Sequence, residues 1–444
     1  MFRRSLVLGI GFGLFVCVGS GSAKGEPLFP NVTHYRLGSG LDVILAPLPG
    51  APRVAVDILF DGGTENEKPG QSGFAHLFEH MALRGSKHIN SKQQNEVLSA
   101  IGASEEAITS FDLIEFYVIA PANQLETLLW LRSDQVGFSA QQVSAEALKV
   151  EKEVVTNELR QRSERAFGRA HARMYQLLFP EPHPYHAQVS GTPEDVQRAQ
   201  VDDIRQFFET YFAPNRMTLV IAGGFQIEAA KKLVEKYFGD IPRGPAGANE
   251  FADAPPLSSE RRETVHERGA VPRLTFAWTV PAPYADDRAE LDILPFLIGR
   301  GPASLLNRRL VRELSLAQSV NCSLSDARAA SVFYCDVALR PGGSVETAEH
   351  EVNKVLAQVR EGVGAANVER AKTAWRADLI NTIEDLLSRA RTLAYYYFYT
   401  RKTDYFAEDL RRHAAVTEES LRQVAARWLD PHRRVVITSV PVPE

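Results

Sequence analysis

The sequence contains no block of basic residues and no interleaving of basic with aromatic residues, so a nucleic acid is not an expected partner. Its formal net charge of −5 gives no bias towards anionic membranes. Beyond residue 23 no stretch is apolar enough to cross a membrane, and no convincing motif for a nucleophilic serine or cysteine is present. Only two cysteines remain beyond that point, so the mature chain can form at most one internal disulfide bond.

The first 23 residues have the pattern of a secretory signal. Arg3 and Arg4 form a positive start, residues 5–18 are an apolar run of 14, and residues 21–23 are small, as at a cleavage site. Fourteen residues are too few to span a bilayer comfortably, which makes an uncleaved membrane anchor the weaker alternative. We therefore expect an exported, soluble protein without stable membrane insertion, most simply periplasmic, with a net charge of −7 once the two arginines are removed.

The clearest functional pattern is His-Leu-Phe-Glu-His at residues 76–80. On a helix, His76 and His80 point the same way and can bind one metal ion, while Glu79 can reach a water beside it. The pattern is the H-x-x-E-H inversion of a zinc-peptidase signature. Ser72 is the expected N-cap of this helix. Two surface histidines with a solvated glutamate are the alternative.

A third ligand is needed, because catalytic zinc usually keeps three protein ligands and one open position. Residues 144–178 are expected to form one uninterrupted charged helix, on which Glu151 and Glu158 lie two turns apart and face the same side. Glu153 is the nearest alternative for the third metal ligand, but it faces another side of that helix than Glu151 and Glu158. Imidazole and carboxylate ligands suit zinc and leave it able to acidify a water.

This combination resembles the pitrilysin family of inverzincin metallopeptidases, which includes insulin-degrading enzyme and the mitochondrial processing peptidase. The resemblance covers essentially the whole mature chain, and it implies that His76, His80 and Glu158 bind one Zn²⁺ per chain. It also implies that Glu79 activates the attacking water and passes the proton to the leaving amine. Glu151 is then a supporting carboxylate of the catalytic site.

The chain also repeats itself at an offset of 217 residues. Ile-Arg-Gln at residues 204–206 matches Leu-Arg-Gln at residues 421–423, and at the same offset Pro214 matches Pro431. With a Pro-, Ala- and Gly-rich stretch between the copies, this predicts a division of the chain into four parts. The parts are a signal peptide at 1–23, an N-terminal zinc-binding catalytic domain at 28–245, a linker at 246–259, and a C-terminal domain without a metal site at 260–444.

Strand-like and helical segments are mixed in both halves, which predicts an α+β fold of two homologous domains, each a mixed β-sheet flanked by helices. Residues 41–46 and 53–60 are expected to pair as strands, as are residues 273–280 and 332–339. Residues 368–400 are expected to form one long helix. In the family, four such domains enclose a clam-shell peptidase chamber, so this chain is expected to supply half of it, as a homodimer or as a heterodimer with a related subunit.

Two segments depart from the family pattern. Family members carry a substrate-binding Arg/Tyr pair in a context resembling L-R-E-x-x-G-L-A-Y. Here Arg312 is retained, but Ser315 stands in the glycine position and Gln318 in the tyrosine position, and the spacing is one residue short. At the substrate edge, Glu106 precedes Ala107 where the family has asparagine, and an ionised carboxylate only accepts hydrogen bonds. This glutamate either favours basic substrate side chains or faces solvent at the rim.

The expected function is hydrolysis of peptides or unfolded segments by a zinc endopeptidase with a dimeric chamber. The alternative is a low-activity subunit of a heterodimer whose partner supplies the Arg/Tyr pair. The intact zinc set favours the first function, and the altered pair favours the second.

The two mature cysteines, Cys322 and Cys335, lie on predicted strands around a turn at residues 326–330. The midpoint of the two positions falls inside that turn, so a simple hairpin places them opposite one another, within reach of a disulfide bond. A slip of one residue would put them on opposite faces of the hairpin. Two buried free cysteines are the other alternative.

Overall fold

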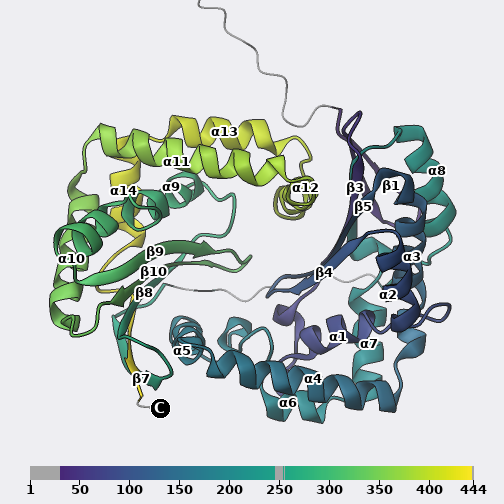
Figure 1. Ribbon diagram of the computed structural model, residues 1–444, viewed down its shortest axis with the longest axis horizontal. Helices are drawn as coiled ribbons and strands as arrows, with labels where there is room; N and C mark the ends of the chain where they lie inside the picture. Colours follow the sequence, from purple (N-terminus) through teal and green to yellow (C-terminus); the bar gives the residue numbers. More distant parts are fainter. Residues whose placement is uncertain (1–30, 246–253, 255, 443–444) are drawn as a thin grey trace, which may run out of the picture.

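The computed structural model describes residues 31–245, 254 and 256–442. The predicted signal peptide, and most of the predicted linker, therefore lie outside the described residues. The described chain forms two mixed β-sheets, each covered by helices (Figure 1), which confirms the α+β fold class. Among these described residues, no helix combines the length and the apolar character that a membrane span requires.

The first sheet has six strands, and its central strands are buried along almost their whole length. Such continuous apolar runs arise where both faces of a sheet are covered. In spatial order the strands are β1 (Thr33–Arg36), β2 (Asp42–Pro47), β6 (Met217–Gly223), β3 (Arg53–Asp61), β5 (Leu113–Pro121) and β4 (Ser104–Thr109). The expected pairing of residues 41–46 with 53–60 is wrong, because β6 lies between β2 and β3 and pairs with both.

The second sheet repeats this order with five strands. They are β7 (Arg261–Glu267), β11 (Val435–Pro441), β8 (Arg273–Val280), β10 (Ser331–Leu339) and β9 (Ala317–Ser325). The expected pairing of residues 273–280 with 332–339 is confirmed. The offset of 217 residues brings β2, β6, β3, β5 and β4 onto these five strands in turn, and in both sheets the one parallel pair occupies the same place. The two halves therefore share one topology.

Except for the last helix of the first half, the helices repeat at about the same offset within the described residues. In the first half they are α1 (Phe74–Ala82), α2 (Ser91–Ala100), α3 (Leu125–Phe138), α4 (Ala145–Glu164), α5 (Gly168–Leu178), α6 (Pro193–Arg198), α7 (Val201–Tyr211) and α8 (Ile227–Phe238). In the second half they are α9 (Arg288–Ile298), α10 (Val345–Glu361), α11 (Ala365–Glu384), α12 (Leu386–Thr400), α13 (Tyr405–Ala415) and α14 (Glu418–Trp428), with a π-helix, η6 (Asn307–Glu313), between α9 and β9.

Two of the long helices expected from the sequence are broken. Residues 144–178 divide into α4 and α5 at Phe167, which adopts φ 68° and lies with its ring under the guanidinium of Arg273 from the second half. Residues 368–400 divide into α11 and α12 at Asp385, whose carboxylate accepts a hydrogen bond from the backbone of Ser388 and so caps α12. Both breaks place a helix against the opposite half.

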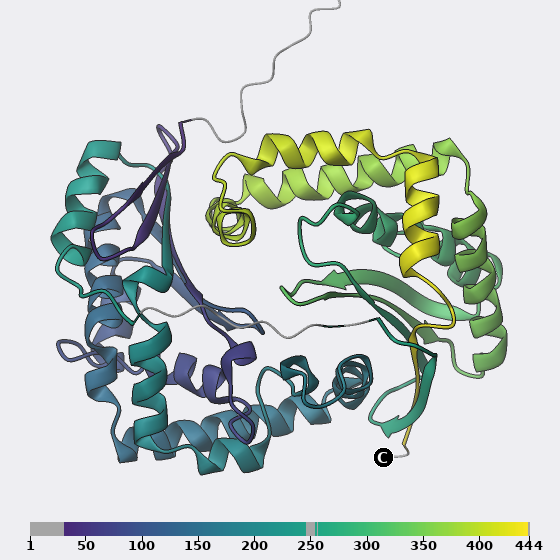
Figure 2. The ribbon, with the colours of Figure 1, turned by 180° about the vertical axis from the view of Figure 1, so that it is seen from behind.

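The two halves exchange these helices. Helix α12 covers one face of the first sheet, where Leu393 and Tyr397 lie in one apolar cluster with Leu59 and Val220. Helix α5 packs in the same manner on the second sheet. Figure 1 and Figure 2 show the consequence: α12 closes one side of the space between the sheets, and α4 and α5 close the other. Each fully buried large side chain in these contacts contributes about 1.5–3 kcal/mol.

The hairpin of β9 and β10 has the register that the midpoint argument predicts. Cys322 and Cys335 are direct partners in the ladder and are joined by a disulfide bond, so the alternative of two free cysteines is wrong. Gly299, just after α9, packs against this bond; a β-carbon added there would lie 2.3 Å from the sulfur of Cys322.

Candidate metal centre and active site

Helix α1, which carries residues 76–80, begins in a way that the sequence did not reveal. Ser72 is not its N-cap: the helix starts after Gly73, which has φ 87°, and the hydroxyl of Ser72 donates instead to Asp195 at 2.6 Å. The carboxylate of Glu67 accepts hydrogen bonds from the backbone N–H groups of Gly73 at 3.1 Å and Ala75 at 2.8 Å. The first turn of the helix is therefore held by a side chain from the preceding loop.

The two histidines of α1 face one carboxylate of α4. The Nε2 atom of His76 lies 3.3 Å from Oε2 of Glu158, and the Nε2 atom of His80 lies 3.7 Å from Oε1 of Glu158. Ligands of a tetrahedral zinc ion, at about 2.0–2.1 Å from the metal, lie about 3.3–3.4 Å apart. The chemistry of these donors, and the short distances from Glu158 to both histidines, therefore fit zinc.

A second carboxylate fixes the orientation of His80. Its Nδ1 atom lies 3.0 Å from Oε2 of Glu151, which also pairs with Arg84. A carboxylate on the outer nitrogen of a metal-binding histidine selects the tautomer that leaves Nε2 for the metal. Glu153 is exposed, and it makes no contact with either histidine within the part of the chain that is described. The structure thus brings together Glu151 and Glu158 and leaves Glu153 outside.

Glu79 lies beside the histidine pair in a buried position. Its side chain accepts a hydrogen bond from the hydroxyl of Thr109 at 2.5 Å and lies 3.4 Å from Nδ1 of His76. Burial favours the neutral acid, but the contacts with His76 and Thr109 prevail and hold the pKa of Glu79 below its usual value. Glu79 is therefore ionised at neutral pH and can accept a proton.

The charges of the ligand set are coupled. The contact with His76 lowers the pKa of Glu158. Burial alone would lower the pKa of His76, but its contacts with Glu158 and Glu79 raise it above the usual value. The carboxylates of the cluster therefore favour a positive charge between them, which a protonated His76 can supply. A divalent cation bound there would supply that charge instead, and His76 would release its proton.

The predicted substrate-edge residues lie on an open strand. Strand β4 pairs with β5 on one side and is the last strand of its sheet. Ala107 lies on this strand, and Glu106 is exposed, with its carboxylate accepting a hydrogen bond from the hydroxyl of Tyr117 at 2.7 Å. The side chain of Glu106 is therefore held at the rim rather than loose in solvent.

The predicted Arg/Tyr-like residues lie elsewhere. Arg312 is the sixth residue of η6, Gln318 is the second residue of β9, and both are exposed. Gln318 is at the end of β9 remote from the hairpin turn that approaches the first half. Over the residues that the structure describes, neither side chain contacts His76, His80 or Glu158.

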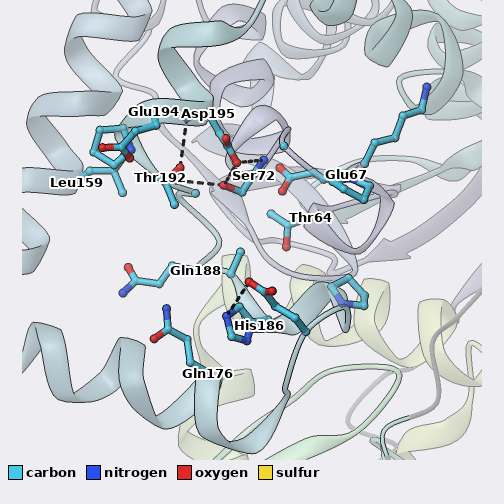
Figure 3. A pocket seen from close by; sticks show the side chains of 18 of the residues that line it. Thr64, Glu67, Ser72, Leu159, Gln176, His186, Gln188, Thr192, Glu194 and Asp195 are labelled. Carbon is cyan, nitrogen blue, oxygen red and sulfur yellow. Dashed lines mark hydrogen bonds and ion pairs between the residues drawn. The ribbon is translucent and has the colours of Figure 1, made fainter.

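A separate cavity of about 1240 Å³ opens near the start of α1. Figure 3 shows Thr64, Glu67 and Ser72 on one side of it and His186 and Gln188 opposite. The histidines of residues 76–80 and Glu158 do not line it. Its wall instead includes the loop that holds the first turn of α1, so the cavity adjoins the support of the candidate site.

Several supporting residues escaped the sequence analysis. Thr109 lies two residues after Ala107, and no local pattern shows that it would reach Glu79. Glu67 stands in a loop, where a lone carboxylate has no distinguishing signal. Among the other histidines, His88 pairs with Asp134 and takes no part in the site.

The second half has lost this donor set. At the offset of 217 residues, His76, Glu79, His80 and Glu158 correspond to Ile293, Phe296, Leu297 and Trp375. These side chains belong to the apolar core of the second half or pack against it. Within the described residues, the side chains close enough together to hold a metal ion are His76, Glu79 and His80 on α1, and Glu158 lies 3.3 Å from His76 beside them.

Comparisons with known proteins agree with this organisation. The family model described as "Insulinase (Peptidase family M16)" matches residues 42–179, and the one described as "Peptidase M16 inactive domain" matches residues 198–374. The chain is 26% identical over 392 residues to the zinc protease PqqE of Helicobacter pylori, covering 86% of this chain and 87% of that protein. It is 25% identical over 416 residues to the mitochondrial-processing peptidase subunit beta of Lentinula edodes, covering 88% and 86%.

The fold is also similar to solved structures. The crystal structure of a protease from Helicobacter pylori superposes with a TM-score of 0.87 at 23% identity, covering 93% of this chain and all of that one. The periplasmic protease PqqL from Escherichia coli gives a TM-score of 0.77 at 18% identity, covering 92% of this chain and 47% of that one.

Proposed function

The chain belongs to the pitrilysin-type peptidase family M16, and from this we propose that it is a zinc metalloendopeptidase in which His76, His80 and Glu158 bind one Zn²⁺. The observation that carries the proposal is the convergence of both Nε2 atoms on the carboxylate of Glu158. Glu151 supports the site through Nδ1 of His80. If His76 and His80 were ordinary surface histidines beside a solvated glutamate, there would be no reason for both to face the carboxylates of α4.

The chemistry follows from the residues. Zinc held there supplies a Lewis acid that makes a water more acidic and polarises a peptide carbonyl. Glu79, ionised and adjacent, accepts the proton of the attacking water and delivers it to the leaving amine. Thr109 fixes the carboxylate of Glu79 by a hydrogen bond from its hydroxyl. No residue forms a covalent bond to the substrate.

The open edge of β4 is the proposed place for the peptide. Its free backbone groups can pair with an extended segment, as a sheet edge does in peptide recognition. Ala107 supports this added strand, and Glu106 contributes negative charge that favours basic substrate side chains. We infer that the physiological protein is exported and that its substrates are peptides or unfolded segments.

Arg312 and Gln318 point to a dimer. Within the described residues, neither side chain contacts the proposed zinc ligands of its own chain, so we infer that they serve a catalytic site across a subunit interface. We infer a chamber built from two chains, either two copies or this chain with a related subunit. The second candidate function, a low-activity subunit, is favoured by glutamine at position 318, because glutamine lacks the phenol of the family's tyrosine.

Metal analysis and peptide hydrolysis test the proposal together. Glu79→Gln is expected to retain one zinc per chain and to lose at least about 10²-fold in kcat, the lower range for a general base. Glu158→Ala is expected to lose the zinc, and Glu153→Gln, on the exposed side of α4, is the matched control that should change neither. Full zinc occupancy in Glu158→Ala would contradict the ligand assignment.

Activity as a function of subunit composition separates the two candidate functions. If the chain acts without a partner that bears an Arg/Tyr pair, Gln318→Tyr should raise kcat. A wild-type chain with bound zinc and no hydrolysis until a related subunit is added would establish the low-activity alternative.

A further inference from the structure

The turn of the β9–β10 hairpin reaches from the second half into the first, beside β4 in Figure 1 and Figure 2. It places Arg328 among three carboxyl groups. The guanidinium lies 2.7 Å from Asp61 and 3.3 Å from Glu65, and the backbone N–H of Arg328 donates to Asp112 at 2.6 Å. Arg401 adds a longer contact to Asp61 at 3.6 Å. The second half thus supplies the cations of a cluster whose acids all belong to the first.

The carboxyl groups of this cluster are buried close to one another, which disfavours their ionisation. The side chain of Glu65 is 4% exposed, and burial together with the neighbouring Asp112 raises the pKa of Glu65 to about 8. Burial also raises the pKa of Asp112, although Tyr185 donates to it at 2.5 Å. Arg328 lies against both Asp61 and Glu65, and its charge offsets part of the rise in the pKa of Glu65. Its removal should therefore loosen the segments that carry the acids.

Those segments are the ones that support the candidate active site. The backbone N–H groups of Thr64 and Glu65 donate to the carbonyl groups of Ser110 at 3.2 Å and Phe111 at 2.8 Å, which joins residues 63–67 to residues 109–112. The first segment ends at Glu67, whose carboxylate holds the first turn of α1. The second segment begins at Thr109, whose hydroxyl donates to Glu79, the proposed general base.

We propose that Arg328 is a positioning residue for hydrolysis: from the second half, it holds the two segments that fix the first turn of α1 and the carboxylate of Glu79. The disulfide bond between Cys322 and Cys335 keeps the hairpin strands in register, so the turn reaches the cluster in one geometry. The kinetic part of this inference rests on the proposed function, whereas the structural coupling does not. The second half then helps to position the catalytic groups of the first half, in addition to enclosing the substrate.

Arg328→Gln tests the proposal, because glutamine removes the charge and leaves the backbone bond to Asp112. We expect kcat to fall between about tenfold and 10²-fold, the range for a small misplacement of reacting groups, with KM changed less than twofold and one zinc per chain retained. Hydrogen exchange should accelerate in residues 63–67, 73–75 and 109–112. Arg328→Lys should give intermediate values.

The matched control is Arg391→Gln, which removes another charged contact between the halves. Arg391 on α12 binds Glu115 at 2.9 and 2.7 Å and touches neither supporting segment. Equal losses of kcat in both variants, or unchanged exchange and kcat in Arg328→Gln, would overturn the proposal. If Arg328→Gln does not fold, Arg328→Lys carries the same comparison at smaller amplitude. If the wild-type protein hydrolyses nothing, the proposed function fails, and the exchange data still decide the coupling.

Discussion

The stability of the second half should fall in alkaline solution because of His413. This histidine is 2% exposed, with Nε2 at 3.1 Å from Asp292, Nδ1 at 2.8 Å from the carbonyl of Asp409, and its ring stacked on Trp375 at 3.5 Å. Acceptors at both nitrogens require both to carry protons. Burial would lower its pKa, but the contacts with Asp292 and Asp409 prevail and raise it to about 9 from 6.5.

The sign and size of the effect follow from linkage. Because the pKa is raised in the folded state, the stabilisation is fully present below the unfolded pKa of about 6.5, falls as pH rises, and is lost as pH passes about 9. A rise in the pKa of His413 from 6.5 to about 9 corresponds to roughly 3 kcal/mol in the free energy of unfolding. Urea unfolding near pH 6 and near pH 9.5 measures it.

The comparison requires two variants. His413→Gln should be much less stable than wild type near pH 6 and should lose most of the pH dependence, whereas His350→Gln, on the exposed face of α10, should behave as wild type. A wild-type protein and a His413→Gln variant that lose the same free energy of unfolding between the two pH values would refute the reasoning.

Three further predictions follow from particular positions. Gly299→Ala should lower the free energy of unfolding by about 1–3 kcal/mol, because the new methyl group overlaps the sulfur of Cys322; denaturant titration measures it. Ser315→Gly should raise it by up to about 1 kcal/mol, since Ser315 has φ 52°, a left-handed conformation that costs a serine more than a glycine; the same titration checks it. Chelation should abolish hydrolysis, and Zn²⁺ added back should restore it; activity that survives complete zinc removal, shown by metal analysis, would contradict the metal assignment.

Local patterns predicted which histidines and which cysteines lie side by side, although they left the choice between a disulfide bond and free thiols open. The spacing of His76 and His80 needs only one helix, and the pairing of Cys322 with Cys335 needs only one hairpin. In both cases the geometry is set within a short stretch of chain. The resemblance supplied the distant ligand, Glu158, which helical periodicity could orient but not bring to the histidines.

The sequence patterns did not predict which segments far apart in the chain pack against one another. Short apolar runs identified β2 and β3, but nothing local shows that β6 inserts between them. The break between α4 and α5 is marked in the sequence by a single residue, Gly168, where an added β-carbon would lie 2.1 Å from the carbonyl oxygen of Arg162. The contact of the neighbouring Phe167 with Arg273 in the other half had no local signal. The glycine position of the family motif was a useful signal, since Ser315 does adopt a glycine-like conformation.

The exchange of helices between the halves has a consequence for biosynthesis. A ribosome completes the first sheet when Gly223 has emerged, but the helix that covers one face of it begins only at Leu386. Until then, apolar side chains such as Leu59 and Val220 have no cover from their own half. A nascent chain that stops after the first half should therefore aggregate or bind a chaperone, and folding should be completed only when nearly the entire polypeptide has been made.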